Sequence, residues 1–160
     1  MEIHNKRVAI AALLAVGAGA ALVGPGTAWS GPMKRETLVV ATTSGKADIS
    51  TEIALTVAEQ EQGLMFRTSI GDSEGMLFIY DKPQIIQMWM HNTYVSLDMV
   101  FVAADGTVLR ITPDTEPLSD RVISSGSKAS AVLELKAGTA MRIGLKPGDH
   151  IQSPSFHPTP

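Results

Sequence analysis

The chain has 160 residues, a formal net charge of −3 and no cysteine, and 44% of its residues are hydrophobic. The lack of cysteine excludes disulfides, thiolate metal sites and lipidation at a cysteine within this chain. The mild acidity gives no basic footprint for nucleic acid, so no nucleic-acid partner is predicted.

Residues 1–30 have the composition of an export signal. Lys6 and Arg7 precede the apolar run Val8–Val23, which ends at the helix-breaking residues Gly24-Pro25-Gly26. This order is typical of a signal peptide. The apolar run has sixteen residues, fewer than the ~20 that span a bilayer comfortably. We therefore expect an exported, periplasmic or extracellular protein, with an N-terminal membrane anchor through residues 8–23 as the alternative.

The rest of the chain has the length of one globular domain, predicted over residues 37–152. Residues 31–36 have no hydrophobic period and are predicted to be a linker. Residues 153–160 contain three prolines and are predicted to be a flexible tail.

Short β-branched and apolar segments separated by turn residues predict strands throughout this domain. In chain order these segments are Leu38–Thr42, Ile49–Val57, Met76–Tyr80, Ile85–Met90, Leu97–Ala103, Val108–Thr112, Val122–Ser124, Ala131–Leu135 and His150–Gln152. Lys82-Pro83 is the predicted break between the third and fourth, and Asp105-Gly106 is a predicted hairpin turn before Val108–Thr112. Thr56 and Glu59 have the spacing of a capping box, which predicts a short helix through Gln62. A second short helix is predicted over Ala140–Ile143.

This pattern favours a mainly β (α+β) fold. Many short strands with one or two short helices are typical of a compact, curled or barrel-like sheet. A parallel sheet built from repeated β-α-β units is disfavoured because no predicted helix is long enough for such crossovers.

The run Met88–Asp98 is the most unusual segment of the domain. If it is a strand, Met88 and Met90 face one way while Trp89 and His91 face the other. Thioether and imidazole groups suit Cu(I), which makes Met88, Met90 and His91 candidate copper ligands. Their opposite facing favours the alternative, in which the methionines fill the core. No cofactor is predicted, because no nucleotide-binding fingerprint occurs.

Two carboxylates lie within apolar strands and are candidates for chemistry. Asp98 shares its predicted face with Val100 and Val102, and Glu134, within Ala131–Leu135, shares its predicted face with Val132. If they met across neighbouring strands they could act as an acid–base pair. Structural pairing, for example of one carboxylate with Arg67, is the more common use of such groups.

Five ordered motifs resemble the family called domain of unknown function 192. They are Gln60-x-x-Gly63-Leu64-Met65-x-Arg67, Gly75-Met76-Leu77-Phe78, Trp89-Met90-x-Asn92-Thr93 with Leu97-Asp98 and Phe101, Leu133-Glu134-Leu135-x-x-Gly138, and Gly148-Asp149. The resemblance covers residues 51–151 and implies a β-dominated fold with short helices, but no reaction, cofactor or substrate. This chain departs from the family at His91, where Lys is usual, and at Val95-Ser96, where an apolar residue followed by Pro is common. The positions favoured for any site are Arg67, Trp89, Asn92, Asp98 and Glu134.

Three functional hypotheses follow. The leading one is an exported binding or accessory protein that recognises a small polar ligand, a sugar or a peptide through a groove near Trp89, with Arg67, His91 and Asn92 beside it. The second is a cell-envelope hydrolase or lyase that uses Asp98 and Glu134 as acid and base. The third is copper handling through methionine, histidine and tryptophan.

Overall fold

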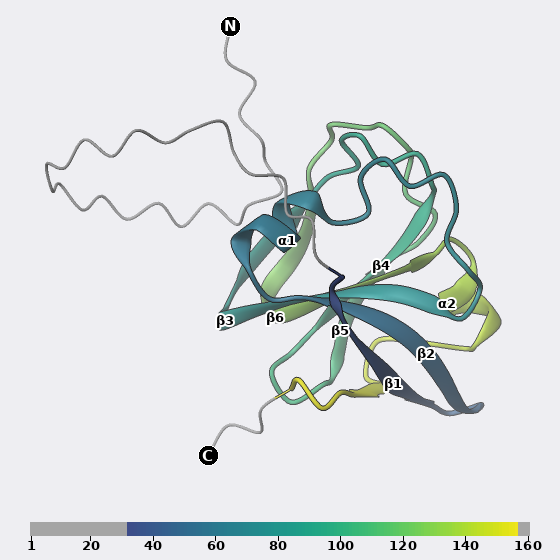
Figure 1. Ribbon diagram of the computed structural model, residues 1–160. Helices are drawn as coiled ribbons and strands as arrows, with labels where there is room; N and C mark the ends of the chain where they lie inside the picture. Colours follow the sequence, from purple (N-terminus) through teal and green to yellow (C-terminus); the bar gives the residue numbers. More distant parts are fainter. Residues whose placement is uncertain (1–31, 157–160) are drawn as a thin grey trace, which may run out of the picture.

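The computed structural model describes residues 32–156, which form one seven-stranded sheet and two short helices (Figure 1). The elements are β1 (Lys34–Thr42), β2 (Gly45–Ala54), α1 (Val57–Gln62), β3 (Glu74–Met88), β4 (Leu97–Val102), β5 (Val108–Thr112), β6 (Ile123–Lys136), α2 (Thr139–Arg142) and β7 (His150–Gln152). The strand order is β5-β4-β6-β3-β2-β1-β7, and only β2 and β3 pair in parallel among these strands. Within residues 32–156, no helix has the length and hydrophobicity to cross a membrane.

The sheet curls until its two ends meet. Backbone hydrogen bonds from Val108 N–H to Asp149 O (2.8 Å) and from Ile151 N–H to Gly106 O (2.9 Å) join β7 to the start of β5. This partial closure covers part of the strand edges, which would otherwise be free to pair with other chains. The predicted mainly β, curled or barrel-like fold is therefore confirmed.

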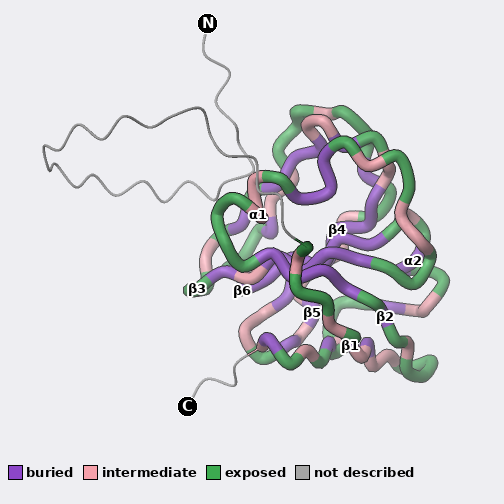
Figure 2. The backbone as a smooth tube through the Cα atoms, viewed as in Figure 1, coloured by how far each residue is buried: buried purple, intermediate pink, exposed green. Residues whose placement is uncertain are grey.

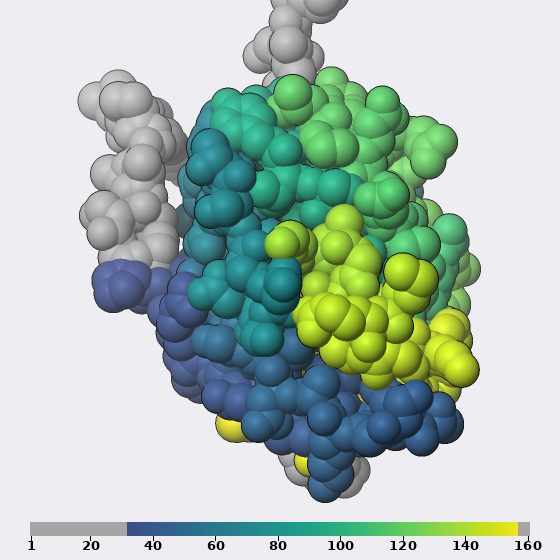
Figure 3. Space-filling model, turned by 90° about the vertical axis from the view of Figure 1, so that its right-hand side faces the viewer, coloured from purple at the N-terminus to yellow at the C-terminus, as the bar shows by residue number. Residues whose placement is uncertain are grey.

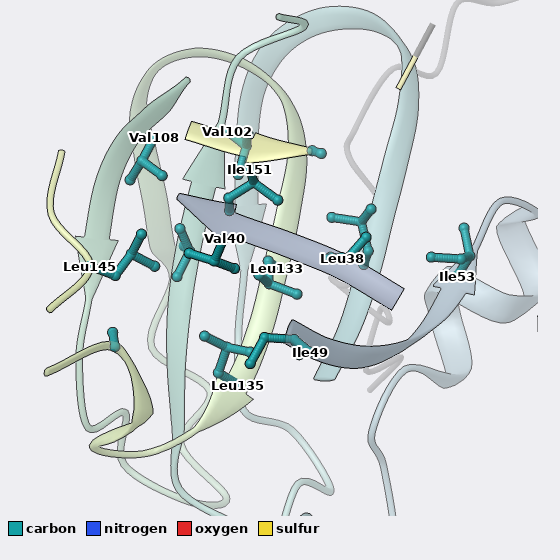
Figure 4. Packing of buried hydrophobic residues seen from close by; sticks show 14 residues of the cluster. Leu38, Val40, Ile49, Ile53, Val102, Val108, Leu133, Leu135, Leu145 and Ile151 are labelled. Carbon is teal, nitrogen blue, oxygen red and sulfur yellow. The ribbon is translucent and has the colours of Figure 1, made fainter. Parts of the chain in front are cut away.

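Both faces of the central strands are buried, which explains their nearly continuous apolar sequence. Successive side chains of a strand point to opposite faces. Val100 of β4 therefore joins the hydrophobic cluster on one face of the sheet, called the inner cluster, while Met99 and Phe101 join the cluster on the opposite face, called the outer cluster. Figure 4 shows side chains of the inner cluster directed toward one another within the curl. Figure 2 shows buried residues along the central strands and many exposed residues in the outer loops.

Two long strands replace four short predicted ones. The predicted break at Lys82-Pro83 lies inside β3, and Val122–Ser124 and Ala131–Leu135 largely belong to the single strand β6. The β3–β6 ladder shifts register between Ile79 and Gln84. Proline lacks the N–H that a regular ladder position needs, and a bulge removes that requirement. The predicted break was wrong for this reason.

The helix prediction was correct at its start. Glu59 N–H donates to Thr56 Oγ1 (3.2 Å), and Glu59 Oε2 accepts from Thr56 N–H (2.8 Å), which together form the expected capping box. The preceding strand β2 ends at Ala54, before the predicted Val57, because these two bonds commit the following residues to the helix.

Both ends of the predicted domain extend further than expected. Part of the predicted linker belongs to β1, which begins at Lys34 because that residue pairs with Ile53 of β2. Ser153 and Ser155 of the predicted flexible tail donate hydroxyl hydrogen bonds to Glu36 at 2.9 and 2.5 Å. These hydrogen bonds hold residues 153–156 against β1. The predicted export signal and residues 157–160 lie outside the described residues.

Candidate functional site

Three connecting loops meet beside the sheet and form what we call the three-loop surface. They are residues 63–73 between α1 and β3, residues 89–96 between β3 and β4, and residues 113–122 between β5 and β6. Figure 1 shows them together at the upper end of the molecule. Two of the motifs that carry the family resemblance enter these loops, the one that ends at Arg67 and the one that begins at Trp89. This surface is therefore the first place to look for a site.

Main-chain hydrogen bonds hold the three loops together. The N–H of Phe66 donates to the carbonyl of Asn92 at 2.8 Å, and the N–H of Leu118 donates to the carbonyl of Thr93 at 3.0 Å. The loop 89–96 is thus the middle of the surface, bonded to a neighbour on each side. Bonds of this kind fix loop positions more firmly than side-chain contacts alone, because they use obligatory backbone groups.

The backbone of this surface is strained. Among residues 32–156, the non-glycine residues with positive φ are Phe66 (63°), Asn92 (52°), Asp114 (50°) and Leu118 (61°), and all four lie in the three loops. Asn and Asp adopt this left-handed conformation relatively easily, whereas bulky side chains rarely do. Strain of this type concentrates at functional sites when the surrounding structure enforces it.

The strained positions present large apolar side chains to solvent. Phe66 is 57% exposed and Leu118 is 56% exposed. Tyr94, 47% exposed, packs edge to face against Phe66 with ring centroids 6.2 Å apart. Exposed aromatic side chains are characteristic of protein recognition surfaces.

Trp89 lies beneath this surface and not in a groove wall. It is 3% exposed and stacks on the His91 ring, with centroids 5.0 Å apart. His91 Nδ1 in turn lies 2.8 Å from Asp120 Oδ1 of the loop 113–122. Trp89 and His91 do share a side, as predicted, but the tryptophan supports the loops and offers no open aromatic plate. The Trp89 ring therefore does not line an open groove, in contrast to the prediction.

The candidate copper ligands are separated. Met88 and Met90 are buried in the outer cluster. The Tyr80 hydroxyl is directed to the Met88 sulfur (3.9 Å), and the Thr115 hydroxyl donates to the Met90 sulfur (3.2 Å). Both methionines thus fill the core, while His91 lies with Trp89. In the described part of the chain, no group of three or more His, Cys, Asp or Glu residues could hold a metal ion.

Asp98 is a structural carboxylate. It is 1% exposed and accepts backbone hydrogen bonds from Asp114 (3.0 Å), Gly138 (3.2 Å) and Ala140 (2.8 Å). These bonds join β4 to the loop 113–122 and to α2. Figure 3 shows the yellow-green segment around α2 at the surface, between teal, green and blue segments. A carboxylate that accepts three backbone hydrogen bonds holds the segments that donate them in place.

Glu134 lies on the other face of the sheet. In the β4–β6 ladder Asp98 pairs with Leu135, whereas Glu134 pairs with Met99. Paired residues share a face and successive residues alternate, so the side chains of Asp98 and Glu134 point in opposite directions. The predicted faces were correct, but the predicted acid–base pair does not form.

Arg67 pairs with a residue that the sequence did not single out. Its guanidinium binds both carboxylate oxygens of Glu52 in β2, and Arg35 of β1 binds the same carboxylate at 2.5 Å. Burial raises the pKa of Glu52, but the hydrogen bonds and charges of the two guanidiniums outweigh burial and hold this pKa below its ordinary value. The three side chains line a cleft of about 440 Å³.

The sequence indicated some of these residues and missed others. Arg67, His91 and Asn92 lie in the three loops, as a site near the motifs requires. Phe66 occupies the unspecified position of the Gly63-Leu64-Met65-x-Arg67 motif. Its left-handed backbone conformation could not be predicted from the sequence, because Phe rarely adopts that conformation. Arg35, which binds the same carboxylate, could have been found only from the pairing of β1 with β2.

One family model and two solved structures resemble this chain. Residues 39–153 match the model of domain of unknown function 192, described as "Uncharacterized ACR". A crystal structure of a proposed transcription regulator from Sinorhizobium meliloti 1021 is 38% identical, with a TM-score of 0.75, and the match covers 78% of this chain and 97% of that one. A protein of unknown function from Novosphingobium aromaticivorans DSM 12444 is 36% identical, with a TM-score of 0.74 and coverage of 81% and 99%. No curated protein matches this chain. The chain belongs to the domain of unknown function 192 family, whose function is unknown.

Proposed function

We propose that this protein is a binding or accessory protein whose three-loop surface recognises a polypeptide segment with an apolar side chain next to basic ones. One observation carries the proposal: Phe66 and Leu118 are held exposed in a left-handed backbone. Under the export prediction, recognition would take place in the periplasm or outside the cell.

Folding alone does not favour Phe66 and Leu118 at these left-handed positions. A left-handed conformation costs an ordinary residue about 1–2 kcal/mol, and Asn or Gly at the same position would avoid most of this cost. Phe66 and Leu118 recover little of it by burial, because each is more than half exposed. Residues that cost stability at the surface are expected where binding requires them.

The chemistry of the partner follows from the composition of the surface. Phe66 and Tyr94 supply rigid aromatic contact area, which favours an apolar side chain as the anchor. The loop 113–122 carries the carboxylates Asp114, Glu116 and Asp120 and a single cation, Arg121. Complementary charge therefore favours lysine or arginine beside the anchor, and it disfavours anionic lipid headgroups and nucleic acid.

The other hypotheses receive less support from this fold. An acid–base hydrolase would need Asp98 and Glu134 on one face, and the strand register places them on opposite faces. Copper handling would need Met88 or Met90 to reach His91, and both methionines belong to the buried outer cluster. The name of the Sinorhizobium relative suggests transcription control, but a formal charge of −3 does not favour direct DNA contact.

Selection from a library of random short peptides displayed on phage tests this proposal. The bait is the wild-type chain, and the variants are Phe66→Asn and Leu118→Asn. We expect enriched peptides to pair an aromatic or aliphatic residue with Lys or Arg, and to bind each variant at least about tenfold more weakly by fluorescence anisotropy. Ile85→Thr is the matched control, because Ile85 is as exposed as Phe66 but lies in β3.

The free energy of unfolding of the same two variants gives a second test. Both should remain folded, with a free energy of unfolding no lower than that of the wild type by more than about 1 kcal/mol, because relief of strain offsets the lost contacts. Absence of enrichment, or equal binding of the enriched peptides to the wild type and both variants, would overturn the proposal.

A further inference from the structure

The cleft that contains Arg67 is lined by residues other than Phe66, Tyr94 and Leu118, the exposed side chains of the three-loop surface. It lies between the first two strands and the end of α1, and its volume is about 440 Å³, within the ~300–1,000 Å³ range of small-molecule sites. The residues that line it are Pro32, Met33, Arg35, Glu52, Gln62, Gly63 and Arg67.

The sheet register builds the polar part of this cleft. Arg35 and Glu52 are directly opposite in the antiparallel β1–β2 pair, so their side chains share a face. Arg67 approaches the same carboxylate from the loop after α1 and binds it through two nitrogen atoms. Glu52 is mostly buried, whereas the side chains of Arg35 and Arg67 are 53% and 38% exposed.

Glu52 positions the two guanidiniums without exhausting them. Each guanidinium has more N–H donors than its bonds to Glu52 use, and the lining residues leave one net positive charge. Planar guanidinium groups match a carboxylate in geometry and can bind it through two parallel hydrogen bonds. The low pKa of Glu52 keeps this carboxylate ionised across the neutral range, so the arginines stay in place.

We propose that this cleft binds an organic monocarboxylate, with the carboxylate on Arg35 and Arg67 and the apolar part against Pro32 and Met33. A single negative charge on the ligand balances the single net positive charge of the lining. Inorganic phosphate fits less well, because its second charge would face Glu52 at close range. The proposal is independent of peptide recognition by the three-loop surface, since it rests on other side chains.

Isothermal titration calorimetry on the full chain tests the site with paired probes. Hexanoate represents an aliphatic acid and N-acetylleucine represents a peptide carboxyl terminus, and their neutral partners are hexanamide and N-acetylleucinamide. We expect saturable binding of at least one acid, at least about tenfold tighter than its amide, since hydrogen bonds to a charged group are strong. The preferred acid identifies the source of the carboxylate.

Variants locate the binding in the cleft. Arg67→Gln and Arg35→Gln should each weaken the preferred acid by about tenfold or more, whereas Arg110→Gln, which removes an exposed arginine of β5, should leave the affinity unchanged. If Arg67→Gln does not fold, Arg35→Gln decides, because it leaves the Arg67–Glu52 pair intact. Equal affinity for acid and amide, no binding of either acid, tighter binding of inorganic phosphate, or unchanged affinity in the folded variants would overturn the proposal.

Discussion

Replacement of Asp98 by Asn gives a direct test of how the candidate site is supported. The substitution keeps the shape of the side chain but removes its charge and turns one oxygen into an amide donor. Oδ1 accepts from Asp114 and Gly138, and Oδ2 accepts from Ala140. In the better of the two amide orientations, the two bonds to Oδ1 survive and the N–H of Ala140 faces another donor.

The expected loss of stability can be worked out from these bonds. A buried N–H left without its acceptor costs about 1–3 kcal/mol, and each surviving bond loses about 1 kcal/mol when its acceptor is no longer charged. Together these effects predict a decrease of about 4 kcal/mol in the free energy of unfolding. For a domain of this size, the corresponding decrease in Tm is roughly 12 °C.

Urea and thermal unfolding, followed by circular dichroism, measure this loss. Asp48→Asn is the matched control, since Asp48 is an exposed aspartate of β2, and its variant should lie within about 0.5 kcal/mol of the wild type. Hydrogen exchange at the Ala140 amide should accelerate beyond the change in global stability, because that N–H loses its acceptor. A decrease below about 1 kcal/mol would refute the view that Asp98 is structural.

Three further predictions concern closure, pH and the helix cap. Gly106→Ala should cost about 3 kcal/mol or more in urea unfolding, because its Cβ would lie 2.3 Å from the Ile151 carbonyl oxygen; Gly148→Ala has a similar φ with open space around it and should cost clearly less. Burial raises the pKa of Glu36 and Glu52, but their hydrogen bonds and ion pairs outweigh burial and leave both pKa values below the ordinary value. The contribution of these two carboxylates to the free energy of unfolding is therefore fully present above about pH 4.3, the ordinary pKa of Glu, and is lost as the pH drops through their pKa values in the folded protein. Glu52→Gln should flatten this acid dependence; an unchanged profile would contradict the assignment. Thr56→Ala should lower Tm by the equivalent of about 1 kcal/mol through loss of the N-cap, and no change would mean that the capping box adds nothing.

Local signals in the sequence predicted the local parts of the fold. The capping box at Thr56 and the hairpin turn at Asp105-Gly106 depend on neighbouring residues only, and both occur. Strand alternation correctly assigned Asp98 and Glu134 to their faces. The sequence could not show that the two faces differ, because that depends on which residues of β4 and β6 stand opposite each other.

Long-range pairing explains what the sequence did not predict. Pro83 lies within β3 because a register shift against β6 removes the need for its N–H. Residues 153–156 are ordered because Glu36, more than a hundred residues earlier, accepts their hydrogen bonds. The sequence singled out Arg67, but its partner Glu52 emerges only when the loop after α1 folds back over β2.

The motif residues and the proposed binding residues have different physical roles in the three loops. Trp89 and Asn92 belong to the motif and support the surface: the tryptophan is buried under His91, and the asparagine carbonyl accepts from Phe66. Phe66 and Leu118, which belong to no quoted motif position, carry the strain and the exposed apolar area. A scaffold whose backbone groups are hydrogen-bonded can hold Phe66 and Leu118 in a strained, exposed conformation, because those hydrogen bonds offset the free-energy cost of the strain. Family members that share the scaffold can therefore differ in what they bind, and the residues to compare are those at positions 66, 94 and 118.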